Sequence, residues 1–375
     1  MKLNLKQLVI IFISFTLIGC VTSNFLKPET GEINNLRLHN NTLTFNTIDS
    51  VFVNISFGNV KGWSAGNKKV SHNYLLPLEA GQKYNIKIEL IKNEQIIKET
   101  TIVNQLTNNP VDDFLKVHFI DVAQGDAILI QTPDKKNIQI DGGYGTISSV
   151  MDTWAGGGVP MALNYLKSKN ISHIDFIIET HYHADHYGGL NDILHSDITS
   201  GLYISNSSNQ SNYTTGSMIS MSDTVNFQVM NIGYPPNVKQ NNPNNQSIVL
   251  KATYGDADFL FTGDAEGIVQ DWIFSQNLST SVDVLKVSHH GARTNGTSNT
   301  AFLSETLNQF AKIAVLSYGA GNPYGHPADL HRFSNFHTYG TGRLISQPDR
   351  QNYKFDSGTI LVETDGKIIF VSTEK

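Results

Sequence analysis

The 375-residue sequence contains a single cysteine, Cys20. No disulfide can therefore form within the mature chain, and its stability must come from core burial. Charged residues make up only 16% of the chain and hydrophobic residues 39%, which is the composition of a globular protein. After the first twenty residues no apolar run approaches the length of a membrane span, which excludes a polytopic pore.

The first twenty residues have the pattern of a secretory leader. Lys2 and Lys6 precede an apolar run at 8–17, and the letters LIGC end at Cys20. This ending resembles the lipobox of bacterial lipoproteins, in which the cysteine is diacylated and becomes the new amino terminus. We therefore expect a signal peptide at 1–20, secretion across the cytoplasmic membrane, and lipid anchoring at the cell envelope through Cys20. An ordinary cleaved signal and an uncleaved anchor helix are the alternatives.

The chain is acidic, with 27 basic and 33 acidic residues. Removal of Lys2 and Lys6 with the leader leaves a formal charge of −8. An acidic body disfavours unsteered binding to nucleic acid, although it does not exclude a local basic groove.

The region before Asn108-Asn109-Pro110 predicts a small β domain. Apolar and polar residues alternate at 50–57 and 84–91, and a third run at 95–103 follows a short turn. Several short alternating strands separated by turn residues are typical of a β-sandwich of the immunoglobulin or fibronectin kind. We expect this all-β sandwich at 21–110, with the Asn-Pro break as its boundary.

From residue 115 the pattern changes to strands, glycine-rich turns and helices. Strands are expected at 117–122, 124–131 and 137–140, and apolar residues at 161–169 have helical spacing. This alternation predicts a layered α/β domain over 111–375.

The most informative stretch is HYHADH at 181–186, which follows the apolar run at 174–180 and so lies at the carboxyl end of a predicted strand. On a turn leaving this strand, His181 and His183 can point the same way, while Asp185 and His186 reach a neighbouring point. Two imidazoles suit one divalent ion, and a carboxylate with an imidazole suits a second. The spacing predicts half of a two-metal site, and a polar surface loop is the alternative.

Other predicted strands also end in carboxylate or imidazole side chains. Asp141 follows the strand at 137–140, Asp264 ends the run at 258–264, and His289 and His290 end the run at 282–290. His326 lies in a turn after the strand at 313–317. Asp264 is placed to bridge two metals, because the glycine before it lets the backbone approach an ion closely. Five other histidines are interpreted as core or surface residues, namely His118, His173, His195, His331 and His337.

These motifs resemble the metallo-β-lactamase superfamily. In content and order, the strings at 119–127, 140–143, 262–264, 285–291 and 322–327 are similar to the metallohydrolase domain of ComEC-type competence proteins. The resemblance runs from about residue 116 to 375 and implies a four-layer αββα sandwich with a metal site at the rim between the sheets. The chain departs from the family at Ala123, where glycine is usual, and at Ala292, where serine is common.

The resemblance also implies a ligand set. His181 and His183 would bind the first of two divalent ions, zinc or manganese. Asp185 and His186 would bind the second, and Asp264 would bridge the pair.

Five further residues have roles implied by the resemblance. His289 would complete the second site and His290 would touch substrate or phosphate, or the two would exchange roles. Asp141 would brace the ligand loop through hydrogen bonds. Where many superfamily members have one more histidine, this chain has Asn244 and Ser247 in the Asn-x-x-Ser string of ComEC-like proteins. The first ion would therefore lack a nitrogen ligand, and an oxygen-richer site accepts manganese as readily as zinc.

Phosphodiester hydrolysis is the reaction that such a pair of ions performs best, because it supplies hydroxide and clamps the attacking and leaving oxygens. Asp185 or Asp264 would orient the hydroxide, and His326 or His290 would stabilise charge or protonate the leaving oxygen. For His326 the alternative is a turn histidine beside a proline. We expect a phosphodiesterase or nuclease outside the cytoplasm. The alternatives are a hydrolase of another surface ester, such as phosphorylcholine on wall polymers, and a non-catalytic module tethered to the envelope.

Overall fold

The computed structural model describes residues 10–11, 33–39, 41–79, 82–104, 113–146, 157–206, 212–293, 299–342 and 353–375. Apart from Ile10–Ile11, the expected leader with Cys20 lies outside these residues, as does the expected domain boundary at 108–110. Both expectations remain predictions. Within the described residues, no helix is long and apolar enough to cross a membrane.

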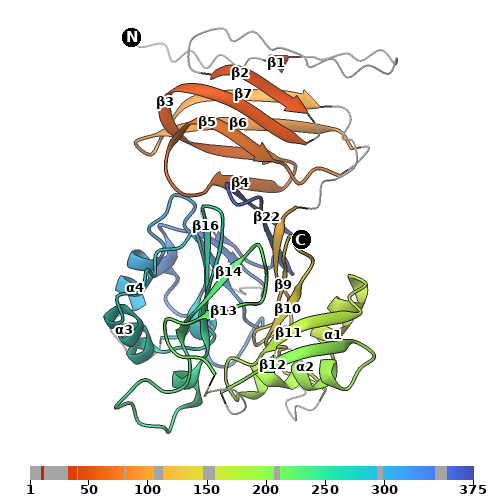
Figure 1. Cartoon of the computed structure of the whole chain (residues 1–375), viewed down its shortest axis with the longest axis vertical. Coiled ribbons are helices and arrows are strands. Elements are labelled where there is room, and N and C mark those ends of the chain that lie inside the picture. The colour runs from red at the N-terminus through yellow and green to blue at the C-terminus, as the bar shows by residue number, and fades with distance from the viewer. Residues whose placement is uncertain are drawn as a thin grey trace.

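The N-terminal part of the molecule is built from strands alone and lies at the top of Figure 1. The strands between residues 33 and 104 are β2 (Ile33–His39), β3 (Thr42–Phe57), β4 (Val60–Ser64), β5 (Lys69–Leu75), β6 (Tyr84–Lys92) and β7 (Gln95–Asn104). The first half of β3 pairs with β2 and β5, and its second half pairs with β6 and β4. A short β1 (Ile10–Ile11) pairs with β7. The strands expected at 50–57, 84–91 and 95–103 are confirmed within β3, β6 and β7.

The N-terminal strands continue directly into a sheet of the larger part of the chain. β4 pairs antiparallel with β22 (Ile368–Thr373), in the register Trp63 to Ile369. Phe370 of β22 packs with Phe57 of β3, their ring centroids being 5.9 Å apart. A second contact is the stack of Phe52 on Phe310, with ring centroids 4.1 Å apart. The small β unit therefore shares both hydrogen bonds and core with the rest of the molecule.

The first sheet of the larger part runs on from β22 in the order β22-β21-β8-β9-β10-β11-β12. Its strands are β8 (Leu115–Phe119), β9 (Ile128–Gln131), β10 (Asn137–Ile140), β11 (His173–Ile178), β12 (Thr199–Ile204) and β21 (Ile360–Thr364). Helices α1 (Met161–Ser168) and α2 (Ala184–Leu194) cover its outer face, where Leu166 and Leu190 join one apolar cluster. The strand expected at 124–131 begins only at Ile128, because Ala123 and Gly125 have positive φ angles of 60° and 121°.

The second sheet contains the remaining strands and has its own pair of helices. In order these are β13 (Met218–Ile219), β14 (Asn226–Asn231), β15 (Val249–Tyr254), β16 (Ala257–Phe261), β17 (Val284–Lys286), β18 (Ile313–Leu316), β19 (His337–Gly340) and β20 (Tyr353–Lys354). Helices α3 (Gly267–Ser275) and α4 (Asn299–Thr306) pack on its outer face through Val269 and Phe302. Short 3-10 turns are η1 (Pro243–Gln246), η2 (Ser288–Gly291) and η3 (Leu330–Phe333).

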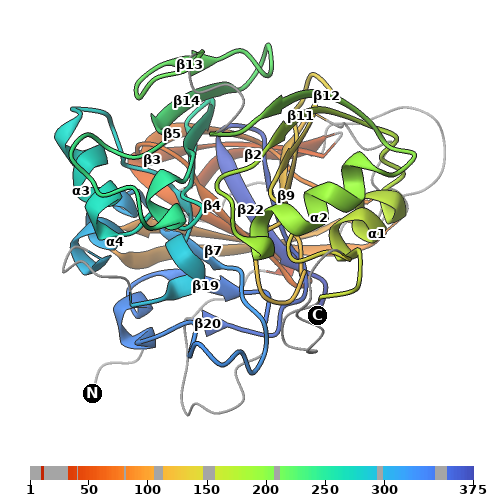
Figure 2. The same cartoon turned by 90° about the horizontal axis from the view of Figure 1, so that it is seen from below.

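The two sheets face each other across the largest apolar core. Alternate residues of β8 and β9, such as Val117 and Ile130, meet Phe259 and Phe261 of β16 there. Figure 2 shows α1 and α2 on one side of the sandwich and α3 and α4 on the other. The predicted four-layer αββα arrangement is confirmed.

A close approach of two glycine segments fixes the start of α2. The backbone N–H of Gly142 donates to the carbonyl oxygen of His186 at 2.6 Å, and that of Gly189 donates to Gly143 at 2.8 Å. A Cβ atom at Gly189 would overlap the carbonyl group of Gly142. Only glycine permits this contact, which presses the first turn of α2 against the loop after β10.

We predict that Gly189→Ala lowers the free energy of unfolding by at least about 2 kcal/mol, because the added methyl group collides with backbone that cannot move aside. Urea unfolding measures the loss. Gly58→Ala is the matched control, since its Cβ atom would meet nothing within 4 Å and its φ of +57° costs only about 1 kcal/mol. A loss at Gly189 no larger than that at Gly58 would contradict the account.

Candidate metal centre

The predicted site residues come from strands that end at one rim of the sandwich. Asp141 follows β10 and the stretch 181–186 follows its parallel neighbour β11. Asp264 follows β16, and His289 and His290 follow its parallel neighbour β17. Because the carboxyl ends of parallel neighbours meet at one edge, each sheet delivers two sets of polar side chains to the same place.

Two groups of three side chains meet at this rim, and within each group the ligand atoms all lie within 4.8 Å of one another. The groups are His181, His183 and Asp264, and Asp185, His186 and His290. All six were singled out from the sequence. Overlapping groups also include Asp126 and Asp141.

In the first group the two histidine rings face each other. His181 Nε2 lies 2.9 Å from His183 Nδ1 and 3.8 Å from Asp264 Oδ2. Burial, together with the neighbouring His186, lowers the pKa of His181 well below its usual value. The ring is therefore neutral near pH 7, which is the form that binds a metal ion.

Asp264 is the centre of the second set of contacts. Its Oδ2 lies 3.3 Å from His186 Nε2 and 3.5 Å from His290 Nε2, and the latter nitrogen is 3.3 Å from Asp185 Oδ2. Burial alone would raise the pKa of Asp264, but His290 and His186 lower it well below the usual value. Asp264 is thus a buried carboxylate of the first group that also contacts the second.

Several buried atoms of these residues lack a hydrogen-bond partner. They are Nε2 of His186, Nε2 of His290 and Oδ1 of Asp264. Leaving a buried polar atom unpaired is costly, on the order of 1–3 kcal/mol for each atom. A metal ion would satisfy imidazole nitrogens and carboxylate oxygens together, so the residues present fit divalent metal binding.

Asp141 lies behind the second group. It accepts hydrogen bonds from the backbone N–H of Thr180 at 2.8 Å and from the Thr180 hydroxyl at 2.6 Å. It also contacts Nδ1 of His186 at 2.7 Å. The bond at Nδ1 sets the ring orientation and turns Nε2 toward the cluster, as a carboxylate behind a metal-binding histidine does.

The structure separates the adjacent His289 and His290. The His290 side chain is 1% exposed and belongs to the group of Asp185 and His186, whereas that of His289 is 23% exposed and lies 3.8 Å from Asp264. The two residues adopt left-handed φ angles of 49° and 53°, so the turn reverses the usual alternation of side chains. The geometry therefore favours the exchanged roles, with His290 as the ligand and His289 facing the rim.

Asn244 and Ser247 lie beside the two groups. Asn244 Nδ2 lies 3.2 Å from Glu266 Oε1 and 3.4 Å from His289 Nδ1. Ser247 Oγ accepts the backbone N–H of Asp264 at 3.1 Å and lies 3.5 Å from His181 Nδ1. These contacts orient side chains and add no third nitrogen to the first group.

His326 lies on the outer side of the histidine pair. Its ring centroid is 5.4 Å from that of His289 and 6.1 Å from that of His290. Burial and the nearby His290 lower the pKa of His326 to about 4. Its Nδ1 is buried without a hydrogen-bond partner.

Two charged residues at the site were missed by the sequence analysis. Lys286 is fully buried and pairs with Asp126, and its ammonium donates to the carbonyl oxygen of Gly263 at 3.2 Å. Asp126 Oδ1 lies 3.5 Å from His290 Nδ1. The available signal was a lysine inside the apolar run at 282–288, because lysine is almost never fully buried unless it is paired.

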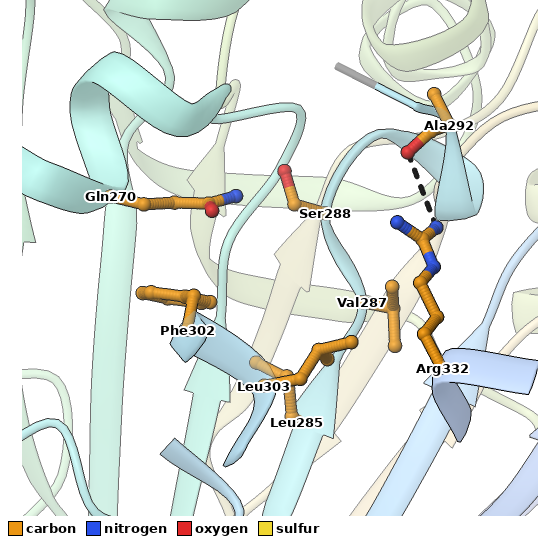
Figure 3. Close-up of a pocket in the computed structure, with 8 residues that line it drawn as sticks. All are labelled: Gln270, Leu285, Val287, Ser288, Ala292, Phe302, Leu303 and Arg332. Carbon is orange, nitrogen blue, oxygen red and sulfur yellow. Dashed lines mark hydrogen bonds between the residues drawn. The ribbon is translucent and has the colours of Figure 1, made fainter. Parts of the chain in front are cut away.

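Arg332 of η3 holds the turn that carries the histidine pair. Its guanidinium donates to the carbonyl oxygens of Gly291 and of Ala292, the latter at 3.2 Å. Figure 3 shows the guanidinium beside Ala292, at the edge of a small cavity of about 20 Å³ that Val287 and Ser288 also line. The two left-handed residues cost of order 1–3 kcal/mol each, and such backbone persists only where neighbouring contacts hold it.

We predict that Arg332→Met weakens zinc binding by about 10-fold or more, since the turn loses the cation that bonds its carbonyl oxygens. Competition with a chelating indicator measures the dissociation constant, and circular dichroism checks the fold. Arg293→Met is the matched control, because the Arg293 side chain is 73% exposed and, among the described residues, pairs with Asp329 on the surface. If a folded Arg332 variant binds zinc as tightly as the control does, the turn keeps its conformation without Arg332 and the prediction is wrong.

Comparison with known proteins found three similarities. Residues 120–222 match the family model described as the metallo-beta-lactamase superfamily. Over 237 residues the chain is 26% identical to ComE operon protein 3 of Bacillus subtilis (strain 168). The aligned region covers 56% of this chain and 29% of that protein. This chain thus spans less than a third of the relative's length. A solved structure described as a new diphosphatase from the PhnP family shows 13% identity and a TM-score of 0.36, covering 67% of this chain and 99% of its own.

The family match falls on residues that build the site. It includes the loop after β10 with Asp141 and the whole stretch 181–186 that supplies four of the six grouped side chains. Residues 120–222 are therefore similar to the metallo-beta-lactamase superfamily, and a longer part of the chain is similar to part of ComE operon protein 3.

Proposed function

We propose that this chain is a two-metal phosphodiesterase of the nuclease-like type. One observation carries the proposal: several groups of three ligand-type side chains meet around the buried carboxylate of Asp264, and two of these groups share no residue. A single-ion site needs only one such group. The match of residues 120–222 to the metallo-beta-lactamase superfamily supports a metal-dependent hydrolase.

Each group would hold one divalent ion. His181 and His183 with Asp264 would hold the first, and Asp185 with two histidines of the second group would hold the other. Mixed nitrogen and oxygen ligands suit both zinc and manganese. When bound, such a pair of ions supplies a hydroxide near neutral pH and neutralises charge on the phosphate oxygens.

The surrounding side chains would position and stabilise the reacting groups. Burial alone would raise the pKa of Asp185, but His186 and His290 lower it, so this side chain stays ionised and can accept a hydrogen bond from the attacking water. His326 has an unpartnered Nδ1 at the rim and would donate a hydrogen bond to the leaving oxygen. His289 is partly exposed beside it and would face the phosphate.

The full-length protein with Mn²⁺ or Zn²⁺ is expected to hydrolyse bis-p-nitrophenyl phosphate. His181→Ala and Asp185→Ala should each lower kcat by at least about 100-fold, because each removes a group that holds an ion or orients the water. Release of p-nitrophenolate measures the rate, and metal content is determined on the same samples.

His173→Ala is the control, and this variant should turn over substrate like the wild type. His173 is an exposed histidine at the start of β11, the end of the strand away from the site, and it is bonded to Thr199. Absence of turnover in a metal-loaded wild-type protein would refute the proposed reaction. A His181→Ala variant as active as the His173 control would refute the assignment of the site.

A further inference from the structure

A lysine is buried beside the metal centre. Lys286 is the last residue of β17, and its side chain is 0% exposed. Its ammonium forms an ion pair with Asp126, donates to the carbonyl oxygen of Gly263 at 3.2 Å, and lies 4.0 Å from Oδ1 of Asp264. Because Asp264 belongs to the first group and contacts the second, this positive charge lies close to the ligand-type atoms of both.

The partner of this lysine contacts the second group directly. Asp126 is 1% exposed and lies in the loop between β8 and β9. Its Oδ1 lies 3.5 Å from His290 Nδ1, and its Oδ2 lies 3.9 Å from His186 Nδ1. Its backbone N–H donates to the carbonyl oxygen of Asp185 at 3.1 Å. Asp126 therefore contacts all three members of the second group.

Lys286 is the fixed cation of this cluster. The overlapping groups contain four carboxylates, which belong to Asp126, Asp141, Asp185 and Asp264. Among the described ion pairs, Lys286 is the only lysine or arginine that contacts any of them. Histidine, in contrast, binds a metal ion only in its neutral form. With ions bound, Lys286 therefore remains as a permanent cation among these carboxylates.

A purely structural role explains the pair poorly. Taking a lysine and an aspartate out of water is costly, and a buried ion pair often stabilises a fold no more than apolar side chains of similar size do. The neighbours of Lys286 along the chain are apolar, since Val284, Leu285 and Val287 are all buried in apolar clusters. An apolar side chain at position 286 would satisfy the packing, so the charge itself requires another explanation.

The effect of each charge on a bound ion has a definite sign. A lysine repels a divalent cation and a carboxylate attracts it, and both forces are stronger in a buried site than in water. The effects of Lys286 and Asp126 oppose each other while both side chains are charged. Removing one charge alone would leave the effect of the other uncompensated.

We propose that Lys286 is a built-in cation of the metal centre and that, paired with Asp126, it sets how tightly the centre holds its ions. Lys286 acts through Asp126 and Asp264, so it is a positioning residue and not a catalytic one. The inference rests on the metal centre of the proposed function and not on the reaction assigned to that centre.

The test uses Lys286→Gln and Asp126→Asn in the full-length protein, since each removes one charge and keeps a hydrogen-bonding amide. Lys286→Gln should tighten zinc binding by about 10-fold or more, and Asp126→Asn should weaken it by about 10-fold or more. The double variant should bind zinc within about 3-fold of the wild type, because both charges are gone. Competition with a chelating indicator measures the dissociation constants, and circular dichroism checks the fold.

Lys251→Gln is the matched control. Lys251 is also a largely buried lysine in an ion pair, with its Nζ 3.2 Å from Asp258 Oδ2. This pair lies away from the site, because Asp258 is near the start of β16 whereas Asp264 follows the end of that strand. The Lys251 variant should bind zinc like the wild type.

A folded Lys286→Gln variant that binds zinc no more tightly than the wild type would overturn the inference. So would two single variants that unfold beside a folded double variant with wild-type affinity, because the pair would then be structural only. If Lys286→Gln alone fails to fold, a double variant that binds zinc no more tightly than Asp126→Asn overturns it. Opposite shifts in zinc affinity without hydrolysis of bis-p-nitrophenyl phosphate by the wild type would support this inference and refute the phosphodiesterase.

Discussion

The structure depends on a cluster of charged groups that is buried at the rim between two sheets. Asp126, Asp141 and Asp264 are each at most 2% exposed, and they are surrounded by buried histidines and by Lys286. Burying an unpaired carboxylate costs several kcal/mol, so each must find an opposite charge or a donor in a fixed place. Lys286 neutralises Asp126, and Thr180 with His186 satisfies Asp141. The buried atoms around Asp264 that have no hydrogen-bond partner are the ones that a metal ion would satisfy.

The rest of the fold holds the strand ends that carry these side chains in place. Gly142 and Gly189 let α2 touch the loop after β10, which sets the first turn that carries Asp185 and His186. On the other sheet, Arg332 bonds the carbonyl oxygens of a turn with two left-handed residues. The two sheets therefore contribute to the site jointly.

The strand-end residues could be read from the sequence because a short apolar run followed by a polar side chain marks a strand tip, and the tips of parallel strands converge. Which of His289 and His290 lies in the second group could not, since it depends on positive φ angles that neither residue favours. The pair of Asp126 and Lys286 joins residues 160 positions apart and gives no local pattern. The pairing of β4 with β22 likewise joins distant segments and gives no local pattern.

The central claim is that two ions bind and that His290, rather than His289, is a ligand. Counting metal by mass spectrometry in the zinc-loaded full-length protein tests it most directly, with His290→Ala and His289→Ala measured in parallel. The account predicts two ions per chain in the wild type and in His289→Ala, and one in His290→Ala. A wild type that holds no ion, or a loss in His289→Ala with two ions retained in His290→Ala, would contradict it.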